Sequence, residues 1–249
     1  MRCIYNITKF INLSYGSIVE SVRNTSNHIN VLCVKVGDAY NSEYVNKLHS
    51  MVSRHLHIPF HMYCLTDDPQ GINEDITCLS IQDTRWSKWW HKISLLSDER
   101  IPEKTSVLFD LDVVLYNNIT DMVMEVTSNL TIAEAYWVDP VRDFKGYNRN
   151  VSCDLNSSVM IWNPTQEVKR VYDYFDQNHE KLLEKYKGID KVFFYHEFEE
   201  FRLSYIDSKK WLQSYHHTGF DETKGALLIF NQGTKNHTVE DERVKRLWG

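Results

Sequence analysis

The feature that most constrains this chain is the alternation, in its first half, of short β-rich apolar runs with a segment of helical periodicity. Apolar runs occupy residues 28–37, 59–71 and 76–81, and the first of them stops at Gly37. Between the first two runs, residues 42–56 place apolar side chains three or four positions apart. Strands that alternate with helices predict an α/β fold with a doubly wound, mostly parallel sheet.

The second half of the chain extends this pattern. We expect further strands within residues 106–119, 129–135, 156–164 and 226–233, and helices at 88–99, 167–186 and 189–201. Residues 1–28 show no clear period and are predicted to be an N-terminal extension. Because the chain has only five Pro and nine Gly and no low-complexity linker, residues 29–249 are predicted to form a single domain.

Composition narrows the possible functions. The 249 residues are 42% hydrophobic and 25% charged, which is typical of a globular protein. The net charge of −6 argues against nucleic acid as a partner, because proteins that bind its backbone usually carry a basic excess. No apolar stretch approaches the ~20 residues of a membrane span. Five scattered cysteines without a CxxC pair favour a reducing compartment, so we expect a cytoplasmic protein, and the Asn-rich usage suggests a microbial or viral origin.

Two aspartates follow the apolar run 107–109. Asp110 and Asp112 are two positions apart, so in an extended chain their carboxylates point to the same side. Ligands of open α/β sheets bind beyond the carboxyl ends of the strands, which is where this pair is predicted to lie. Two carboxylates so close together repel each other, and Mg²⁺ or Mn²⁺ would remove that cost. The alternative is a pair of turn-forming aspartates at a strand exit.

The string FDLDVVL is similar to the opening motif of haloacid-dehalogenase-like phosphatases. On that alternative hypothesis Asp110 would be the nucleophile and Asp112 the acid or base. Those enzymes carry the motif near the start of their domain, whereas here several predicted strands and helices precede it. Val113 also stands where their motif has Gly.

A second family matches more of the chain, roughly residues 29–248. The matching pieces, in order, are VKVGDAYNSEYVNKL (34–48), CLTDD (64–68), WWHKISL (89–95), LFDLDVVL (108–115), NSSVMIW (156–162) and FNQGTKNH (230–237). With these pieces the sequence resembles the GT-A-type, DXD-containing nucleotide-sugar glycosyltransferases. The resemblance implies a Rossmann-like, mostly parallel sheet with flanking helices. It also implies a transferase that moves a sugar from a nucleoside-diphosphate sugar, with UDP favoured, to a hydroxyl of a glycan, protein or small molecule.

The resemblance also implies roles for particular residues. Asp110, Asp112 and Asn231 would bind Mn²⁺ or Mg²⁺, and Asp190 and Asn156 would act at the sugar. The residues implied to contact the donor nucleotide, its diphosphate or its sugar are Val36, Gly37, Lys92, Asp110, Leu111, Asp112, Ser157, Gly233 and Lys235.

The sequence also departs from the family. Asn231 and Gln232 stand where related sequences often carry a metal-binding His, and Gln is absent after Asp190. These departures leave open a degenerate protein that only binds a nucleotide sugar or glycan. Simpler structural roles are also open, with Lys92 as an exposed helix lysine, Asp190 as a helix cap and residues 156–158 as a self-capping turn. His216 and His217 are predicted to form a surface pair.

Overall fold

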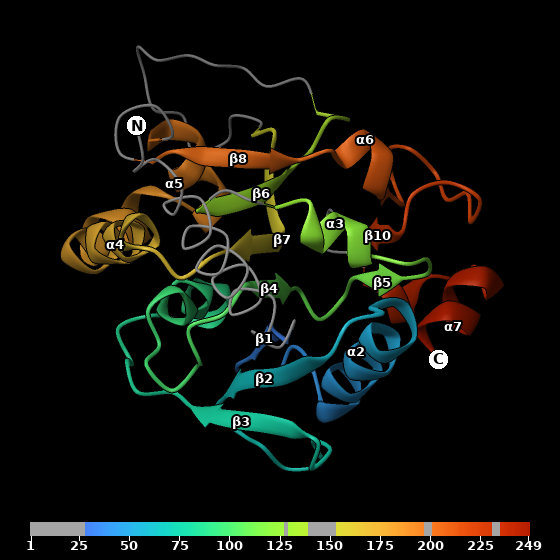
Figure 1. The fold of residues 1–249 in the computed structure, drawn as a ribbon, viewed down its shortest axis with the longest axis horizontal. Coiled ribbons are helices and arrows are strands. Elements are labelled where there is room, and N and C mark those ends of the chain that lie inside the picture. The colour runs from blue at the N-terminus through green and yellow to red at the C-terminus, as the bar shows by residue number, and fades with distance from the viewer. Residues whose placement is uncertain (1–27, 127–128, 139–152, 197–200, 231–234) are drawn as a thin grey trace, which may run out of the picture.

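A computed structural model describes residues 28–126, 129–138, 153–196, 201–230 and 235–249. The predicted extension therefore lies outside the described residues, apart from His28. Within the described residues the core is a seven-stranded sheet of order β3-β2-β1-β4-β7-β6-β8, with helices on both faces (Figure 1). Its strands are β1 (Ile29–Lys35), β2 (Phe60–Thr66), β3 (Ile76–Ser80), β4 (Ser106–Phe109), β6 (Leu130–Glu134), β7 (Leu155–Trp162) and β8 (Leu203–Ile206).

A smaller three-stranded sheet of order β5-β10-β9 adjoins the first. Its strands are β5 (Val114–Leu115), β9 (Leu212–Ser214) and β10 (Leu227–Ile229). The α-helices are α2 (Ser42–His55), α3 (Thr120–Met124), α4 (Gln166–Lys185), α5 (Ile189–His196), α6 (Ser208–Trp211) and α7 (Glu242–Trp248). Short 3₁₀ helices are η1 (Lys88–Lys92), η2 (Ser94–Leu96) and η3 (Asn236–Thr238).

The large sheet is mostly parallel, as predicted, with β7 as the exception. β1 pairs in parallel with both β2 and β4, and β2 pairs in parallel with β3. β7 runs antiparallel to β4 and to β6. The two faces of β1 are both buried, since Val31 and Cys33 belong to one apolar cluster and Leu32 to the other. A strand covered on both faces reads as a continuous apolar run, which explains the sequence pattern there.

Two helices show how the predicted periodicity becomes packing. On α2, the buried residues are Tyr44, Val45, Leu48, Met51 and Val52, which have the predicted spacing of three or four positions. α4 buries Val168, Val171, Phe175 and Leu182 on the opposite face of the sheet. Its first turn is capped by the Thr165 side chain, which accepts a hydrogen bond from the backbone N–H of Val168.

The single helix predicted over residues 88–99 is wrong. The structure has η1 and η2 there instead. Side chains three positions apart align along a 3₁₀ helix. Trp90, Ile93 and Leu96 have this spacing and are buried together, so the 3₁₀ turns bury the same face that an α-helix was predicted to bury.

The last third of the fold departs furthest from the prediction. The helix predicted over 189–201 ends at His196 as far as the structure describes it, and the edge strand β8 follows. The short elements α3, α6, β9 and α7 were not predicted. Each is brief, and the strand β9 has only three residues, too few for a recognisable period. No helix in the described ranges is both long and apolar enough to cross a membrane.

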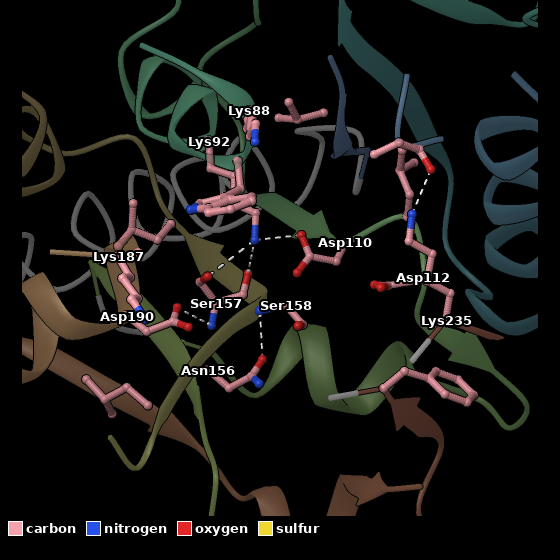
Figure 2. A pocket seen from close by; sticks show the side chains of 18 of the residues that line it. Lys88, Lys92, Asp110, Asp112, Asn156, Ser157, Ser158, Lys187, Asp190 and Lys235 are labelled. Carbon is pink, nitrogen blue, oxygen red and sulfur yellow. Dashed lines mark hydrogen bonds and ion pairs between the residues drawn. The ribbon is translucent and has the colours of Figure 1, made fainter. Parts of the chain in front are cut away.

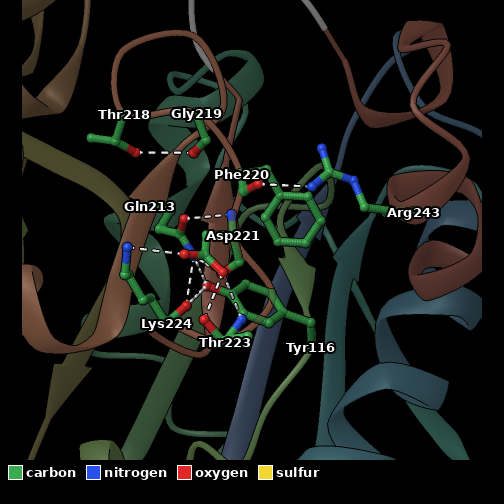
Figure 3. A network of polar contacts seen from close by, with 9 residues as sticks. All are labelled: Tyr116, Gln213, Thr218, Gly219, Phe220, Asp221, Thr223, Lys224 and Arg243. Carbon is green, nitrogen blue, oxygen red and sulfur yellow. Dashed lines mark hydrogen bonds and ion pairs between the residues drawn. The ribbon is translucent and has the colours of Figure 1, made fainter.

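A buried polar network fixes the loop between β9 and β10 (Figure 3). The Gln213 side chain donates to the backbone carbonyls of Asp221 and Lys224 and to the Tyr116 hydroxyl, and accepts from the N–H of Asp221. The Tyr116 hydroxyl in turn donates to the Lys224 carbonyl. Because Gln213 is buried, the loss of these partners would leave its amide unpaired and raise the free energy of the folded state. The network therefore holds residues 215–225 in one conformation.

Candidate functional site

A cavity of about 1270 Å³ opens at the carboxyl ends of β1 and β4. Ten of the residues predicted for the site lie in its wall, namely Val36, Gly37, Lys92, Asp110, Leu111, Asp112, Asn156, Ser157, Asp190 and Lys235. The remaining two, Asn231 and Gly233, lie outside the described residues. The structure thus brings together segments that are far apart in the sequence, while the roles predicted for these residues stay predictions.

The antiparallel direction of β7 explains how two of these segments meet. Phe109 of β4 lies opposite Val159 of β7. The pairing continues by one residue, because the N–H of Asp110 donates to the carbonyl of Ser158 at 2.9 Å. The beginning of β7 therefore lies beside the end of β4, and residues 156–158 face the acidic pair across the cavity (Figure 2).

Lys92 links the two strands at this point. Its ammonium lies 2.6 Å from Asp110 Oδ1 and donates to the Ser157 carbonyl at 3.0 Å and to Ser157 Oγ at 3.2 Å. Only 5% of the Lys92 side chain is exposed, against 29% of the Asp110 side chain. Lys92 is therefore not the exposed helix lysine of the alternative interpretation, but a buried cation whose charge is balanced by a carboxylate in the cavity wall.

Asp112 has a different environment. Its Oδ2 accepts a hydrogen bond of 2.8 Å from the Tyr40 hydroxyl. Burial, reinforced by the nearby charge of Asp110, raises the pKa of Asp112 to about 6. Lys235 approaches from the C-terminal side, with its ammonium 3.9 Å from the centre of the Tyr40 ring and bonded to the Ala39 carbonyl. Burial, followed by the charge of Asp112, raises the pKa of Tyr40, so this hydroxyl stays a donor.

Asp190 lies in the first turn of α5 and reaches across to β7. Its Oδ1 accepts the N–H of Ser157 at 2.8 Å, the same residue that binds Lys92 through its carbonyl and hydroxyl. The carboxylate is thus bonded to the neighbouring strand, and the alternative of a simple helix cap is not what the structure shows. Burial raises the pKa of Asp190 above the usual range of an aspartate.

The remaining predicted residues occupy the rim and floor. Gly37 has φ of 73°, a conformation that favours glycine, and its N–H donates to Asp67 Oδ2 at 2.8 Å. Asn156 Oδ1 accepts the N–H of Ser158 at 2.8 Å, which is the self-capping turn considered as an alternative. The Asn156 amide group can still donate to a ligand, because only its oxygen is used in this turn.

The adjacent tryptophans have opposite surroundings. Trp90 is buried and stacks on Trp86 with ring centres 6.3 Å apart, whereas Trp89 is 49% exposed and lines the cavity. One tryptophan therefore belongs to the core and the other is available to a ligand. Two adjacent indoles cannot both face one core, which is the signal that reveals this pair.

Two aromatic residues that were not predicted also contribute to the cavity wall. Trp137, after β6, and His217, in the loop fixed by Gln213, both line the cavity. Their rings stack with centres 6.3 Å apart and planes inclined by 25°. The surface pair predicted for His216 and His217 is thus incomplete, because His217 also belongs to the cavity wall. A single sequence gives no signal that would bring residues 137 and 217 together.

The described residues supply part of a binding site for a hard divalent cation. Asp110 and Asp112 each use one carboxylate oxygen for Lys92 and Tyr40 respectively, which leaves a second oxygen on each. Carboxylate oxygens are the ligands that Mg²⁺ and Mn²⁺ prefer. In the part of the chain that the structure describes, no cluster of three or more His, Cys, Asp or Glu side chains could hold a metal. The predicted third ligand, Asn231, falls outside that part. His237 does not line the cavity and packs edge-on against Tyr44 instead.

Comparisons with known proteins identify the fold. No family model and no curated protein matches this sequence. Among solved structures, the galactosyltransferase LgtC in complex with donor and acceptor sugar analogs superposes with a TM-score of 0.59 at 11% identity, over 88% of this chain and 95% of the other. A crystal structure of an active-site mutant of LgtC gives a TM-score of 0.58 at 12% identity, over 88% and 93%. This chain has a GT-A-like α/β fold.

The likeness covers most of both chains. It also bears on the phosphatase hypothesis. Asp110 follows β4, and three strands of the same sheet precede β4 in the sequence. A motif near the start of the domain, which the phosphatase hypothesis requires, is therefore not what the structure shows.

Proposed function

We propose that this protein is a metal-dependent glycosyltransferase that moves a sugar from a nucleoside-diphosphate sugar, with UDP favoured, to an acceptor hydroxyl. The observation that carries the proposal is the position of Asp110 and Asp112 in one cavity with Lys92, Asp190 and Lys235. The cavity of about 1270 Å³ has room for both a nucleotide sugar and an acceptor, since sites for a single drug-sized ligand measure roughly 300–1,000 Å³. LgtC, which shares the fold, has been crystallised with analogs of both.

The proposed reaction breaks the bond between the sugar and the diphosphate and forms a bond to an acceptor oxygen. A Mn²⁺ or Mg²⁺ ion held by Asp110 and Asp112, with Asn231 as the predicted third ligand, would neutralise the negative charge that the departing diphosphate gains. Lys235 would contact the diphosphate on the side of Asp112. Val36, Gly37 and Leu111 would contact the nucleotide with their backbone, and Gly233 completes this set.

The other wall would hold the sugar. Positive charge develops on the sugar ring as the bond to the diphosphate breaks. The Asp190 carboxylate, fixed by the N–H of Ser157, would face that charge. Asn156, whose amide nitrogen remains free of the turn bond, would donate to a sugar hydroxyl. Lys92 positions this group, because it bonds to Asp110 on one side and to Ser157 on the other.

The test is a screen of nucleotide sugars with Mn²⁺, in which release of the nucleoside diphosphate is measured. We expect release from at least one UDP-sugar, loss of release on chelation, and a decrease of about 10²–10³-fold in Asp112→Asn. Asp121→Asn, which changes an exposed aspartate away from the cavity, is the matched control and should leave turnover unchanged.

Two outcomes would contradict the proposal. Donor binding with no turnover above background, and no difference between Asp112→Asn and the parent, would indicate a degenerate protein that only binds the nucleotide sugar. No release and no calorimetric binding of UDP or GDP would reject the proposal entirely. Hydrolysis of p-nitrophenyl phosphate, measured in the same samples, would favour the phosphatase hypothesis.

A further inference from the structure

Charge is unevenly distributed around the cavity. Four lysines lie in the wall that includes Asp190, although the chain as a whole has a net charge of −6. They are Lys88, Lys92, Lys187 and Lys191. Figure 2 shows Lys88, Lys92 and Lys187 on the side of the cavity away from Asp112 and Lys235. A basic surface on an acidic protein needs a specific explanation, because net charge alone would repel anions.

Two of these lysines lack an ion-pair partner in the described ranges. Lys92 is paired with Asp110, as described above. Lys88 and Lys187 are exposed, and neither ammonium forms an ion pair with any residue that the structure describes. Gly188 and the first residues of α5 also line the cavity. The positive end of the dipole of this helix therefore adds to the positive electrostatic potential of the wall.

Trp89 presents an apolar surface next to these charges. Its indole is half exposed, and Gly188 lies beside it, since a Cβ at Gly188 would be in ordinary van der Waals contact with its Nε1 at 3.8 Å. The Lys88 ammonium lies 5.8 Å from the centre of the Trp89 ring. Lys88 has φ of 52°, the one positive value among non-glycine residues in the described ranges. Such a conformation is uncommon for a residue other than glycine, so the surrounding structure must hold Lys88 in it.

Aromatic faces bind sugar rings because the electron-rich face attracts the weakly positive C–H groups of the sugar. An ammonium beside that ring recognises an anionic group on the same sugar. We propose that the acceptor is an anionic saccharide, whose ring lies on Trp89 and whose phosphate, sulfate or carboxylate group lies between Lys88 and Lys187. This inference rests on the proposed function, since it names the second substrate of the same cavity.

The acceptor is a better occupant of this wall than the donor. The diphosphate of the donor is proposed to lie with Asp110, Asp112 and Lys235, and the last two lie on the opposite side of the cavity (Figure 2). Asp190, which is proposed to face the transferred sugar, stands next to Lys187 and the start of α5. A molecule that contacts both Trp89 and Lys187 therefore approaches the reacting sugar from the side away from the nucleotide.

The test measures binding of three small probes to the full chain with UDP and Mn²⁺ present. The probes are glucose, glucose 6-phosphate and glucuronate, which separate a neutral sugar, a phosphate and a carboxylate on similar rings. Binding is followed by saturation-transfer NMR and by competition at low salt. We expect at least one anionic probe to bind about tenfold more tightly than glucose, and 0.5 M salt to remove most of that preference.

Single substitutions show which residues cause the preference for anionic probes. Lys88→Gln and Lys187→Gln should each reduce this preference several-fold without weakening the binding of glucose. Trp89→Ala should weaken the binding of all three probes. Lys209→Gln, which changes a solvent-exposed lysine of α6 outside the cavity, is the control. All three lysines are exposed, so these variants should fold like the parent, which circular dichroism checks.

Equal binding of glucose and both anionic probes overturns the inference, and so does a preference that survives both lysine substitutions. UDP binding, measured separately in the same samples, keeps the two proposals apart. If UDP binds while the anionic preference is absent, the inference fails and the proposed function stands. If UDP does not bind but the preference depends on Lys88 and Lys187, the cavity binds anionic saccharides and its role as a transferase acceptor site is rejected.

Discussion

Replacement of Lys92 by Met tests the electrostatics of the site without assuming any activity. Methionine keeps most of the lysine stem but has neither its charge nor its donors. The change removes the 2.6 Å ion pair with Asp110 and both hydrogen bonds to Ser157. It therefore leaves a carboxylate without its cation in a wall that already contains Asp112.

The expected cost follows from burial. Removing one partner of a fully buried ion pair costs about 3–5 kcal/mol. Here Lys92 is buried but 29% of the Asp110 side chain is exposed, so water recovers part of the loss. We expect Lys92→Met to lower the free energy of unfolding by about 2–3 kcal/mol. Asp110→Asn added to Lys92→Met should recover about 1–2 kcal/mol of it, because the unpaired charge is then gone.

We expect the same variant to bind metal more tightly, although its fold is less stable. Lys92 repels a cation held by the two carboxylates, and it occupies one oxygen of Asp110. A unit charge ~5 Å from a divalent ion contributes about 7 kcal/mol at an effective dielectric constant of about 20, so even a strongly screened effect exceeds tenfold. We expect Lys92→Met to bind Mn²⁺ at least about tenfold more tightly than the parent, while Asp110→Asn binds it more weakly.

The assays are urea unfolding followed by circular dichroism, without metal, and calorimetric titration with Mn²⁺. Arg85 is a suitable control position, because Arg85→Met breaks ion pairs with Asp83 and Asp176 that are partly open to solvent, and it should cost about 1 kcal/mol, less than Lys92→Met. A change of less than about 0.5 kcal/mol in the free energy of unfolding of Lys92→Met would contradict the assigned ion pair. Weaker Mn²⁺ binding by a destabilised Lys92→Met variant would contradict it as well.

Three further predictions concern other parts of the structure. Burial raises the pKa of Asp112 to about 6, so the contribution of its protonated form to the stability of the fold is lost as the pH rises through 6. Asp112→Asn should therefore stabilise the metal-free protein at pH 7.5 and have little effect at pH 3.5, as measured by urea unfolding. Gln213→Ala should lower the free energy of unfolding by about 1–3 kcal/mol because it leaves backbone groups of the 215–225 loop unpaired, whereas exposed Gln177→Ala should have almost no effect in the same assay. Trp90→Ala should lower the free energy of unfolding by about 3–5 kcal/mol, and Trp89→Ala, which changes an exposed residue, by less than about 1 kcal/mol. Similar values for the two variants would show that the indoles are wrongly assigned to the core and to the cavity.

Most of the first half of the fold could be predicted from the sequence because its signals are local. The β1 and β2 runs are apolar on both faces, and α2 has an apolar stripe of helical period. The failure at 88–99 is also local in origin. Apolar residues three positions apart fit both an α-helix and a 3₁₀ helix, and the choice depends on packing against α4 and the sheet.

The site was predictable where one segment carries its own evidence. Asp110 and Asp112 follow a buried strand, so their position at a carboxyl edge follows from local sequence. His217 and Trp137 could not be predicted to meet, since their contact depends on how the loop after β9 is held by Gln213 and Tyr116. That network consists mainly of bonds from side chains to backbone carbonyls, and such bonds leave no pattern in a single sequence.

The direction of β7 is the step on which the assembly of the cavity depends. In an entirely parallel sheet, the beginning of every strand lies at the edge opposite the carboxyl ends. Asn156 and Ser157, which begin β7, would then be separated from Asp110 by the length of the sheet. Because β7 is antiparallel to β4, its first residues lie beside Asp110. The hydrogen bond from Ser157 to Asp190 joins α5 to β7, so the start of α5 lies at the same edge. One reversed strand therefore unites the acidic pair, the buried lysine and the carboxylate of α5, which is why local signals predicted these residues separately but not their contacts.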